Sequence, residues 1–241
     1  MAKRAANRSV AAREQRHSSS KALDFFPTPP WAARALLQHV LAPRFQLRDQ
    51  TAWEPACGEG HMVEILAECF RLTHGSDFHD YGKGYAVGNF LTAGLGVDVA
   101  RWPHPEPVDW IITNPPYIEA SAFFDRAQAI SRVGVAFLLR TAWVEGEARY
   151  EQIFRHNAPR LIAHFAERVP MHAGIWDPNG SAPSCYSWFV WYNSPDRITE
   201  SIWIPPGRER ELTAPSDYER FGAKTDQSRK TRHADDHNAD L

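Results

Sequence analysis

Residues 51–77 read TAWEPACGEGHMVEILAECFRLTHGSD and contain a complete strand–turn–helix–strand pattern. TAWEPA is typical of a short strand, and the glycines of CGEG indicate a tight turn. HMVEILAECF then places its apolar side chains at helical spacing, and RLTHGSD follows as a second strand. A strand that returns through a helix to another strand predicts a parallel β–α–β unit.

The same alternation continues on both sides of this unit. Thr28 precedes Pro29 and Pro30, which predicts a helix with Thr28 as its N-cap and WAARALLQHVL as its body. The downstream predictions are, in order, a strand at 108–113, a helix at 121–132, a strand at 133–140, a helix at 146–156, a strand at 160–167 and a final strand at 186–192. This order predicts an α/β fold, a doubly wound and mostly parallel sheet with helices on both faces. In such sheets ligands bind at the carboxyl ends of the strands.

Composition limits the class of protein. The chain has 241 residues, of which 43% are hydrophobic and 23% charged, enough for one substantial core. No apolar run approaches the roughly 20 residues that a membrane-spanning helix requires, and the first 21 residues lack the apolar centre of a secretory signal. The three cysteines show no C-x-x-C spacing, and the eleven histidines show no H-E-x-x-H pattern. We therefore expect a cytoplasmic protein without disulfide bonds, metal or membrane contact.

Both ends of the chain differ from the middle. The first 21 residues hold six Lys or Arg against one Glu, which predicts a basic disordered arm over 1–22. This arm is either a solvated tail or a sequence-independent contact to phosphates. From Gly207 the sequence has few apolar anchors, so a largely disordered tail is predicted over 207–241. A single folded domain is expected over 23–206.

The glycine turn and the acid after the next strand indicate a nucleoside site. Gly58 and Gly60 let the backbone approach a ligand closely at the start of a helix. Asp77 lies 19 residues after Gly58, where a carboxylate can accept both hydrogen bonds of a ribose diol. The chain has no G-x-x-x-x-G-K-[ST] sequence, which argues against ATP bound by a P-loop. A tight turn followed by a surface Asp is the alternative interpretation.

A second strand end carries the sequence NPPY at 114–117. Asn114 precedes a proline and is therefore held extended, while Pro115 and Pro116 fix φ and remove two backbone donors. The Asn114 side-chain oxygen and the Pro115 carbonyl can accept hydrogens from an exocyclic NH2 group, and Tyr117 can stack on the ring that carries it. Two acceptors draw the amine towards tetrahedral geometry and return electron density to its nitrogen, so no strong general base is required. A purely structural proline turn is the alternative.

Together these segments resemble the S-adenosylmethionine-dependent N6-adenine DNA methyltransferases. The segments are FPTPP at 26–30, EPACGEGHM at 54–62 with Asp77, GNFL at 88–91 and NPPY at 114–117. Their order is similar to that of the γ group and of short phage and prophage enzymes. NPPY alone is shared with other amino methyltransferases, and the combination is more specific. The resemblance covers about residues 23–192 and implies a catalytic domain with a class I methyltransferase (Rossmann-like) fold that ends in an antiparallel hairpin.

The resemblance implies that S-adenosylmethionine is the cofactor and that no metal is needed. The residues implied to bind it are Thr28, Glu54, Pro55, Ala56, Gly58, Gly60, Asp77, Phe78, Asn89, Phe90 and Asn114. Thr28 and the turn would surround the methionine part, and Asp77 would bind the ribose hydroxyls. Phe78, Asn89 and Phe90 would contact the cofactor adenine. Asn89 stands where many relatives have Asp, and its amide oxygen can still accept from an adenine amino group.

The substrate implied is double-stranded DNA, from which the target adenine would be flipped out. The residues implied or considered to contact DNA are Asn114, Pro115, Pro116, Tyr117, Met171, Trp176, Arg140, Arg149 and Arg168. The NPPY residues would grip the base, and Met171 or Trp176 would hold its second face; the sequence does not choose between these two. Each arginine is either a DNA contact or an ordinary surface residue.

Fewer than 50 residues follow the last predicted strand, whereas many γ-group enzymes have a long target-recognition domain. A small or permissive recognition sequence is therefore predicted, read by loops at 141–151 and 170–187. Two other functions stay open, an amino methyltransferase that acts on RNA bases or a protein glutamine, and a non-catalytic nucleic-acid-binding relative. The oligomeric state is not predicted.

Overall fold

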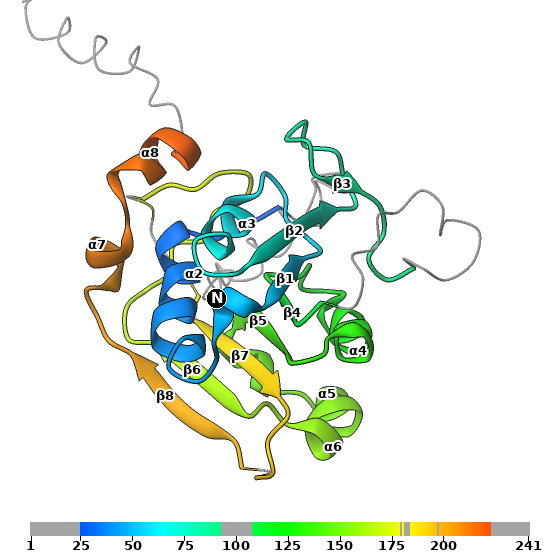
Figure 1. Ribbon diagram of the computed structural model, residues 1–241. Helices are drawn as coiled ribbons and strands as arrows, with labels where there is room; N and C mark the ends of the chain where they lie inside the picture. Colours follow the sequence, from blue (N-terminus) through cyan, green and yellow to red (C-terminus); the bar gives the residue numbers. More distant parts are fainter. Residues whose placement is uncertain (1–24, 93–107, 179, 181–183, 197, 223–241) are drawn as a thin grey trace, which may run out of the picture.

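In the described residues of the computed structural model, eight strands form one sheet in the order β3-β2-β1-β4-β5-β7-β6-β8 (Figure 1). The structure describes residues 25–92, 108–178, 180, 184–196 and 198–222. The strands are β1 (Thr51–Glu54), β2 (Leu72–Asp77), β3 (Ala86–Val87), β4 (Trp110–Thr113), β5 (Gly134–Arg140), β6 (Leu161–Phe165), β7 (Tyr186–Tyr192) and β8 (Glu200–Ile204).

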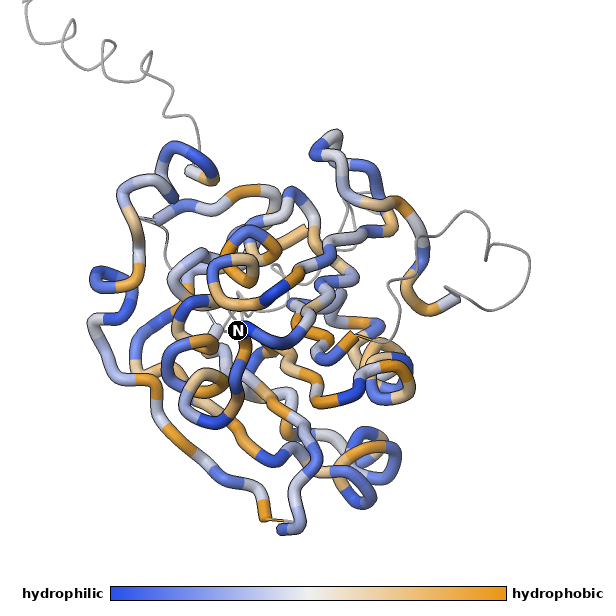
Figure 2. Tube along the Cα trace, in the orientation of Figure 1, coloured by the Kyte–Doolittle hydropathy of each residue, from blue (hydrophilic) through white to orange (hydrophobic). Residues whose placement is uncertain are grey.

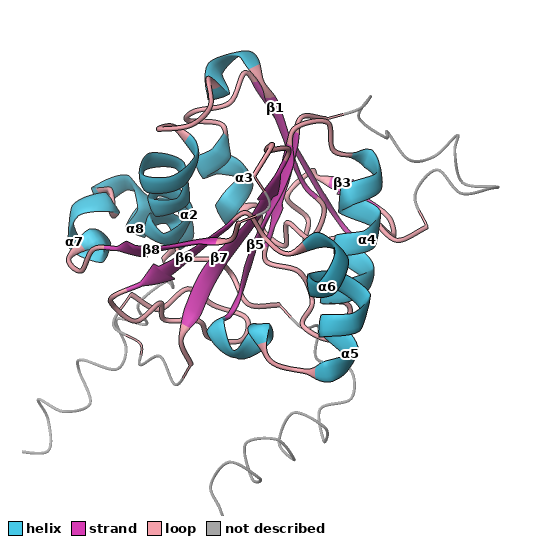
Figure 3. Cartoon of the chain, turned by 90° about the horizontal axis from the view of Figure 1, so that it is seen from below, coloured by secondary structure: helices cyan, strands magenta, loops and turns pink. Residues whose placement is uncertain are grey.

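Helices pack on both faces of this sheet, as Figure 3 shows. The α-helices are α2 (Pro30–Leu36), α3 (His61–Leu66), α4 (Ala120–Ile130), α5 (Glu147–Arg149), α6 (Arg155–Asn157), α7 (Arg208–Leu212) and α8 (Pro215–Phe221). The π-helical segments are η1 (Leu37–Leu41) and η4 (Tyr150–Phe154), and the 3-10 helices are η2 (Leu47–Asp49) and η3 (Thr141–Val144). The helices α2, α3, α7 and α8 lie on one side of the sheet, and α4, α5 and α6 lie on the other.

Strand β7 is the one antiparallel member of the described sheet. It runs antiparallel to both β5 and β6, with Arg140 opposite Tyr186 and Leu161 opposite Val190. The other neighbouring strands pair in parallel. The mostly parallel sheet is therefore confirmed. The predicted antiparallel pair is present as β6 and β7, but it is not terminal, because β8 lies beyond β6 at the edge of the sheet. Because all parallel strands point the same way, β1, β2 and β4 end at one edge of the sheet, where loops can build a site.

The core consists of two apolar layers, one on each face of the sheet. Every residue of β1 and β4 is buried, as are the first six residues of β5 and of β7. Burial on both faces explains why these strands are nearly continuous apolar runs. Along the tube in Figure 2, hydrophobic and hydrophilic segments alternate over short distances. No helix in the described part of the chain is long and apolar enough to cross a membrane.

Three sequence predictions about the elements are wrong. Thr28 is not the N-cap of the first helix, because α2 begins at Pro30 and Pro29 occupies the cap without a side-chain hydrogen bond. The helix after the glycine turn ends at Leu66 rather than at residue 70. The strand at 186–192 is not the last, because β8 follows and pairs in parallel with β6. β8 alternates poorly in sequence and is largely exposed, which explains why its pattern is weak.

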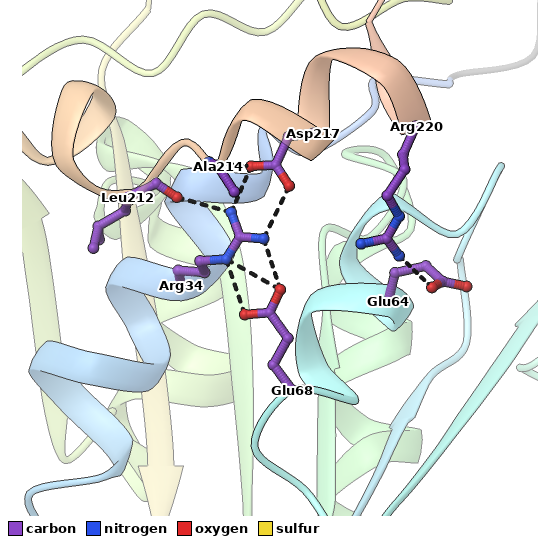
Figure 4. A network of polar contacts seen from close by, with 7 residues as sticks. All are labelled: Arg34, Glu64, Glu68, Leu212, Ala214, Asp217 and Arg220. Atoms are coloured by element: carbon purple, nitrogen blue, oxygen red, sulfur yellow. Dashed lines mark hydrogen bonds and ion pairs between the residues drawn. The ribbon is translucent and has the colours of Figure 1, made fainter.

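The tail predicted from Gly207 is also wrong for its first part, since α7 and α8 are folded helices. Figure 4 shows why they pack. Asp217 is fully buried and pairs with Arg34 of α2, whose Nη1 and Nη2 lie 2.5 and 2.9 Å from its two oxygens. The same guanidinium donates to Glu68 and to the Leu212 carbonyl. A single buried arginine therefore fastens both helices to the body, while residues 223–241 and the predicted arm at 1–22 lie outside the described residues.

Candidate active site

A cavity of about 420 Å³ opens at the carboxyl ends of β1, β2 and β4. Its size is typical of a ligand-binding pocket. Its walls come from the segment before α2, from the glycine turn and from the loops that follow β2 and β4. The sequence-predicted residues that line it are Thr28, Glu54, Pro55, Ala56, Asp77, Phe78, Asn89, Phe90, Asn114 and Pro116. Segments far apart in the sequence therefore meet around one space.

The glycine turn is shaped by positive φ angles and by Asp77. Gly58 and Gly60 have φ of +53° and +89°, the left-handed region that side chains disfavour. A Cβ on Gly58 would lie 2.2 Å from the Phe25 ring, so this glycine also permits close packing of the segment before α2. The Gly58 N–H donates to Asp77 Oδ2 at 2.8 Å, and the His79 N–H donates to Oδ1 at 2.9 Å. The two glycines do not themselves line the cavity; they place Asp77 and the turn beside it.

Glu54 is the buried acid of this site. It is the last residue of β1, its side chain is 3% exposed, and its Oε2 has no hydrogen-bond partner among the described residues. Burial raises the pKa of the Glu54 carboxyl well above its usual value, and the charge of Asp77 raises it further. Glu54 lines the cavity, and a buried carboxylate with an oxygen that no described residue satisfies is suited to a cationic or hydrogen-bond-donating group of a ligand.

Aromatic and amide side chains form another part of the cavity wall. Phe90 is 2% exposed and packs against Trp53 and Phe123, with ring centres 5.3 and 4.9 Å away. Phe78 is 73% exposed at the rim. Asn89 Oδ1 accepts from the Leu91 N–H at 2.9 Å, so the amide that replaces the expected Asp is fixed by a local turn. This wall can enclose a flat heterocycle and offers an amide for its edge.

Asn114 follows β4 directly and faces the same cavity. Its Nδ2 donates to the Phe26 carbonyl at 3.0 Å, while its Oδ1 is buried and has no partner among the described residues. A carbonyl can only accept, so this contact orients the amide with its oxygen free. Pro115 is buried and Pro116 lines the cavity. The prediction of an oriented acceptor at this strand end therefore has a geometric basis, supplied by the FPTPP segment.

Tyr117 lies beside the cavity but does not line it. Its hydroxyl is 3.0 Å from that of Tyr186, and its ring centre is 5.7 Å from that of Phe26. The guanidinium carbon of Arg140 lies 4.9 Å from the centre of the same ring. In the described structure the ring is thus covered rather than open to the cavity.

The remaining predicted residues are not brought to the cavity. Met171 is 6% exposed within the core, and Trp176 is 1% exposed and stacks on Tyr218 of α8 at 5.6 Å. Arg168 donates to Cys185 Sγ at 2.9 Å. Arg149 donates to the carbonyls of Trp143 and Glu145. As these side chains stand, Met171 and Trp176 are packing residues, and their roles towards DNA stay predictions.

Sequence reasoning missed about half of the cavity wall. The residues to which it gave no role are Phe25, Phe26, Pro27, Cys57, His61, Met62, His79, Tyr81, Ile118, Glu119 and Phe123. Several lie within the FPTPP and EPACGEGHM segments and most others lie next to a recognised motif, so position in or beside a motif was the available signal. Phe26 could have been singled out in this way, but its contribution to Asn114 is a backbone carbonyl that no residue pattern reveals.

No protein-family model and no curated protein matches the sequence. The fold is similar to that of a candidate class I S-adenosylmethionine-dependent methyltransferase from Listeria monocytogenes, with TM-score 0.51, 14% identity, and coverage of 82% of this chain and 72% of that one. It is also similar to the methyltransferase subunit of a type I restriction-modification system from Streptococcus thermophilus (TM-score 0.57, 12% identity, 81% and 53%). A third similar structure is a modification subunit of a candidate type I restriction enzyme from Vibrio vulnificus YJ016. Its TM-score is 0.50 at 15% identity, and the match covers 88% of this chain and 55% of that one.

These likenesses establish the fold. The chain has the class I S-adenosylmethionine-dependent methyltransferase fold, as the resemblance of its motifs implied. It spans about half the length of the two restriction-modification subunits. Within the described ranges, no group of three or more His, Cys, Asp or Glu side chains is arranged to hold a metal ion.

Proposed function

We propose that the protein transfers a methyl group from S-adenosylmethionine to the N6 amino group of adenine in double-stranded DNA. The observation that carries this proposal is the Asn114 amide. Its nitrogen donates to the Phe26 carbonyl, its oxygen is buried and has no partner among the described residues, and Asn114 lines the cavity together with Glu54 and Asp77. An acceptor for an amine thus faces the place where a nucleoside cofactor would bind.

The cavity residues fit S-adenosylmethionine part by part. The unpartnered Glu54 Oε2 suits the ammonium group of the methionine moiety. Asp77 keeps lone pairs for two ribose hydroxyls after accepting from Gly58 and His79, because each carboxylate oxygen has two acceptor sites. Phe78 and Phe90 suit the faces of the adenine. When bound there, the cofactor would supply a methyl group made electrophilic by its sulfonium sulfur.

Asn114 and Pro115 prepare the attacking amine. The amino group of adenine is a weak nucleophile because its lone pair is delocalised into the ring. Asn114 Oδ1 and the Pro115 carbonyl would accept its two hydrogens and hold the nitrogen in line with the methyl carbon. Transfer of the methyl group to this nitrogen would leave the electron pair of the broken C–S bond on sulfur, and the methylated nitrogen would then lose a proton to solvent. The contribution of the chain is orientation together with electrostatic preorganisation of the acceptors.

The preference for DNA rests on two observations. The FPTPP segment, which in the resembling enzymes precedes the other motifs, supplies the carbonyl that orients Asn114. One solved structure of similar fold is described as the methyltransferase subunit of a type I restriction-modification system, and another as a modification subunit of a candidate type I restriction enzyme. We expect short loops to read a small or permissive recognition sequence.

The experiment is digestion of treated DNA to nucleosides followed by mass spectrometry, with isotope-labelled S-adenosylmethionine. We expect N6-methyladenine to appear with wild-type protein and to form about 10²- to 10³-fold more slowly with Asn114→Ala. Parallel reactions with RNA and with a protein extract test the alternative amino acceptors. Labelling of RNA or protein alone would overturn the DNA proposal, and no binding of S-adenosylmethionine would instead favour a non-catalytic relative.

A further inference from the structure

The end of β5 places a cation over the ring of Tyr117. Arg140 is the last residue of β5 and lies opposite Tyr186 in the antiparallel register with β7. Its guanidinium carbon is 4.9 Å from the centre of the Tyr117 ring. The Tyr117 hydroxyl is 3.0 Å from that of Tyr186, which is 5% exposed. The ring is therefore held at its hydroxyl end and covered by a group on a long, flexible side chain.

The Arg140 guanidinium covers a face of the Tyr117 ring that the proposed function needs for the target base. Tyr117 is the ring on which the target adenine would stack, yet it does not line the cavity that holds Asn114. A planar guanidinium and a planar base both bind the face of an aromatic ring. While the guanidinium covers a face, no base can stack on it.

Arg140 is also incompletely satisfied in this position. Its Nε is buried and has no hydrogen-bond partner among the described residues, within which Arg140 also forms no ion pair. A buried donor without an acceptor is unfavourable, and a guanidinium binds phosphate with two parallel hydrogen bonds. Arg149 lies 4.8 Å from the Trp143 ring, and its Nε is likewise buried without a partner among the described residues. Its Nη1, however, donates to two backbone carbonyls, and in the described residues the Arg140 guanidinium has no such anchor.

On the basis of the proposed function, we propose that the Arg140 guanidinium occupies the target-base position over Tyr117 in the DNA-free protein and moves to a DNA phosphate when the adenine enters. Arg140 is then a positioning residue that guards the ring before binding and holds the DNA backbone afterwards. In this exchange the adenine replaces the Arg140 guanidinium over the Tyr117 ring. The phosphate then offers an acceptor to Arg140 Nε, which has no partner among the described residues.

The first test measures the phosphate contact. Binding of the full-length protein to a labelled mixed-sequence duplex is measured by fluorescence anisotropy over a range of salt concentrations. Each phosphate neutralised contributes about 0.9 to the slope of log K against log salt, so Arg140→Ala should lower the slope by about that amount and Arg140→Lys should keep it. Arg220→Ala is the control, because it removes a cation 4.8 Å from the Phe221 ring of α8. An unchanged slope in Arg140→Ala would overturn the proposal.

The second test measures access to the ring without any phosphate. Adenosine is titrated into protein saturated with S-adenosylhomocysteine, so that the cofactor pocket is filled. We expect Arg140→Ala to bind adenosine about two- to fivefold more tightly than wild type, the equivalent of one exposed cation–π contact, and Tyr117→Ala to lose this gain. Equal or weaker binding by Arg140→Ala refutes the guarding role. Neither measurement needs turnover. Failure of the proposed function would appear as an absence of N6-methyladenine in DNA treated with wild-type protein, and it is therefore distinguishable from failure of the Arg140 proposal.

Discussion

Replacing Asp77 by Ala is the sharpest test of the cofactor site. Asp77 ends β2, and its two oxygens accept the N–H groups of Gly58 and His79 at 2.8 and 2.9 Å. The same carboxylate faces the cavity, where it would accept the two ribose hydroxyls of S-adenosylmethionine. The substitution therefore removes the proposed ribose contact and also releases the glycine turn from its anchor.

The magnitude follows from the bonds that are lost. A hydrogen bond to a charged group contributes about 1.5–3 kcal/mol, and the two ribose bonds share one carboxylate, so their contributions are not additive. A loss of about 2–4 kcal/mol in binding free energy corresponds to a dissociation constant about 30- to 900-fold higher. Because the turn loses its anchor as well, we expect the upper part of this range.

Isothermal titration calorimetry with S-adenosylmethionine measures this change directly. Asp80→Ala is the matched control, because Asp80 also accepts a backbone N–H, from Gly82 at 2.7 Å, in an exposed turn outside the cavity. We expect the control to keep wild-type affinity, and circular dichroism should show both variants folded. Wild-type affinity in folded Asp77→Ala would refute the assignment of the cavity to this cofactor.

Three further outcomes are expected. Asn114→Ala should lower turnover by about 10²–10³, while its dissociation constant for S-adenosylmethionine stays near that of wild type; full turnover would remove the proposed role of the amide. Burial raises the pKa of Glu54, so its contribution to the free energy of unfolding is complete below the ordinary pKa of Glu and is lost as the pH rises through the folded pKa. In urea unfolding measured at a series of pH values, Glu54→Gln should remove this contribution to the pH dependence of the free energy of unfolding. The same pH dependence in the variant as in wild type would contradict the prediction. Arg34→Ala should lower the free energy of unfolding by about 3–5 kcal/mol, because it leaves Asp217 buried and unpaired, whereas Arg44→Ala breaks a more exposed pair with Glu200 and should cost about 1 kcal/mol or less.

The sequence predicted the site best where chemistry is local. Gly58, Gly60 and Asp77 lie on one β–α–β unit, whose period and turn are visible in a short window. Asn114 could be recognised because the prolines after it restrict its backbone. These residues converge because parallel strands end at the same edge of the sheet, which makes their convergence predictable.

The sequence predicted poorly what depends on distant contacts. The polar composition after Gly207 indicated a disordered tail, yet Asp217 is buried because Arg34, 183 positions earlier, neutralises it. The wall residue Phe26 acts through its backbone carbonyl, which has no residue signature. Trp176 was considered for a base contact because it is aromatic and lies near the position that the resemblance implies, but α8, which was not predicted, covers it.

The Arg34–Asp217 pair has a consequence for how the chain folds during synthesis. The two partners are 183 positions apart, so at roughly 5–20 residues per second about 10 to 40 s separate their appearance. During that interval Arg34 of α2 lacks its buried partner Asp217. A nascent domain in which every strand is already made therefore still lacks the ion pair that holds α8 to α2. We therefore expect newly made chains to gain resistance to proteolysis late, when α8 emerges, rather than in proportion to the strands completed.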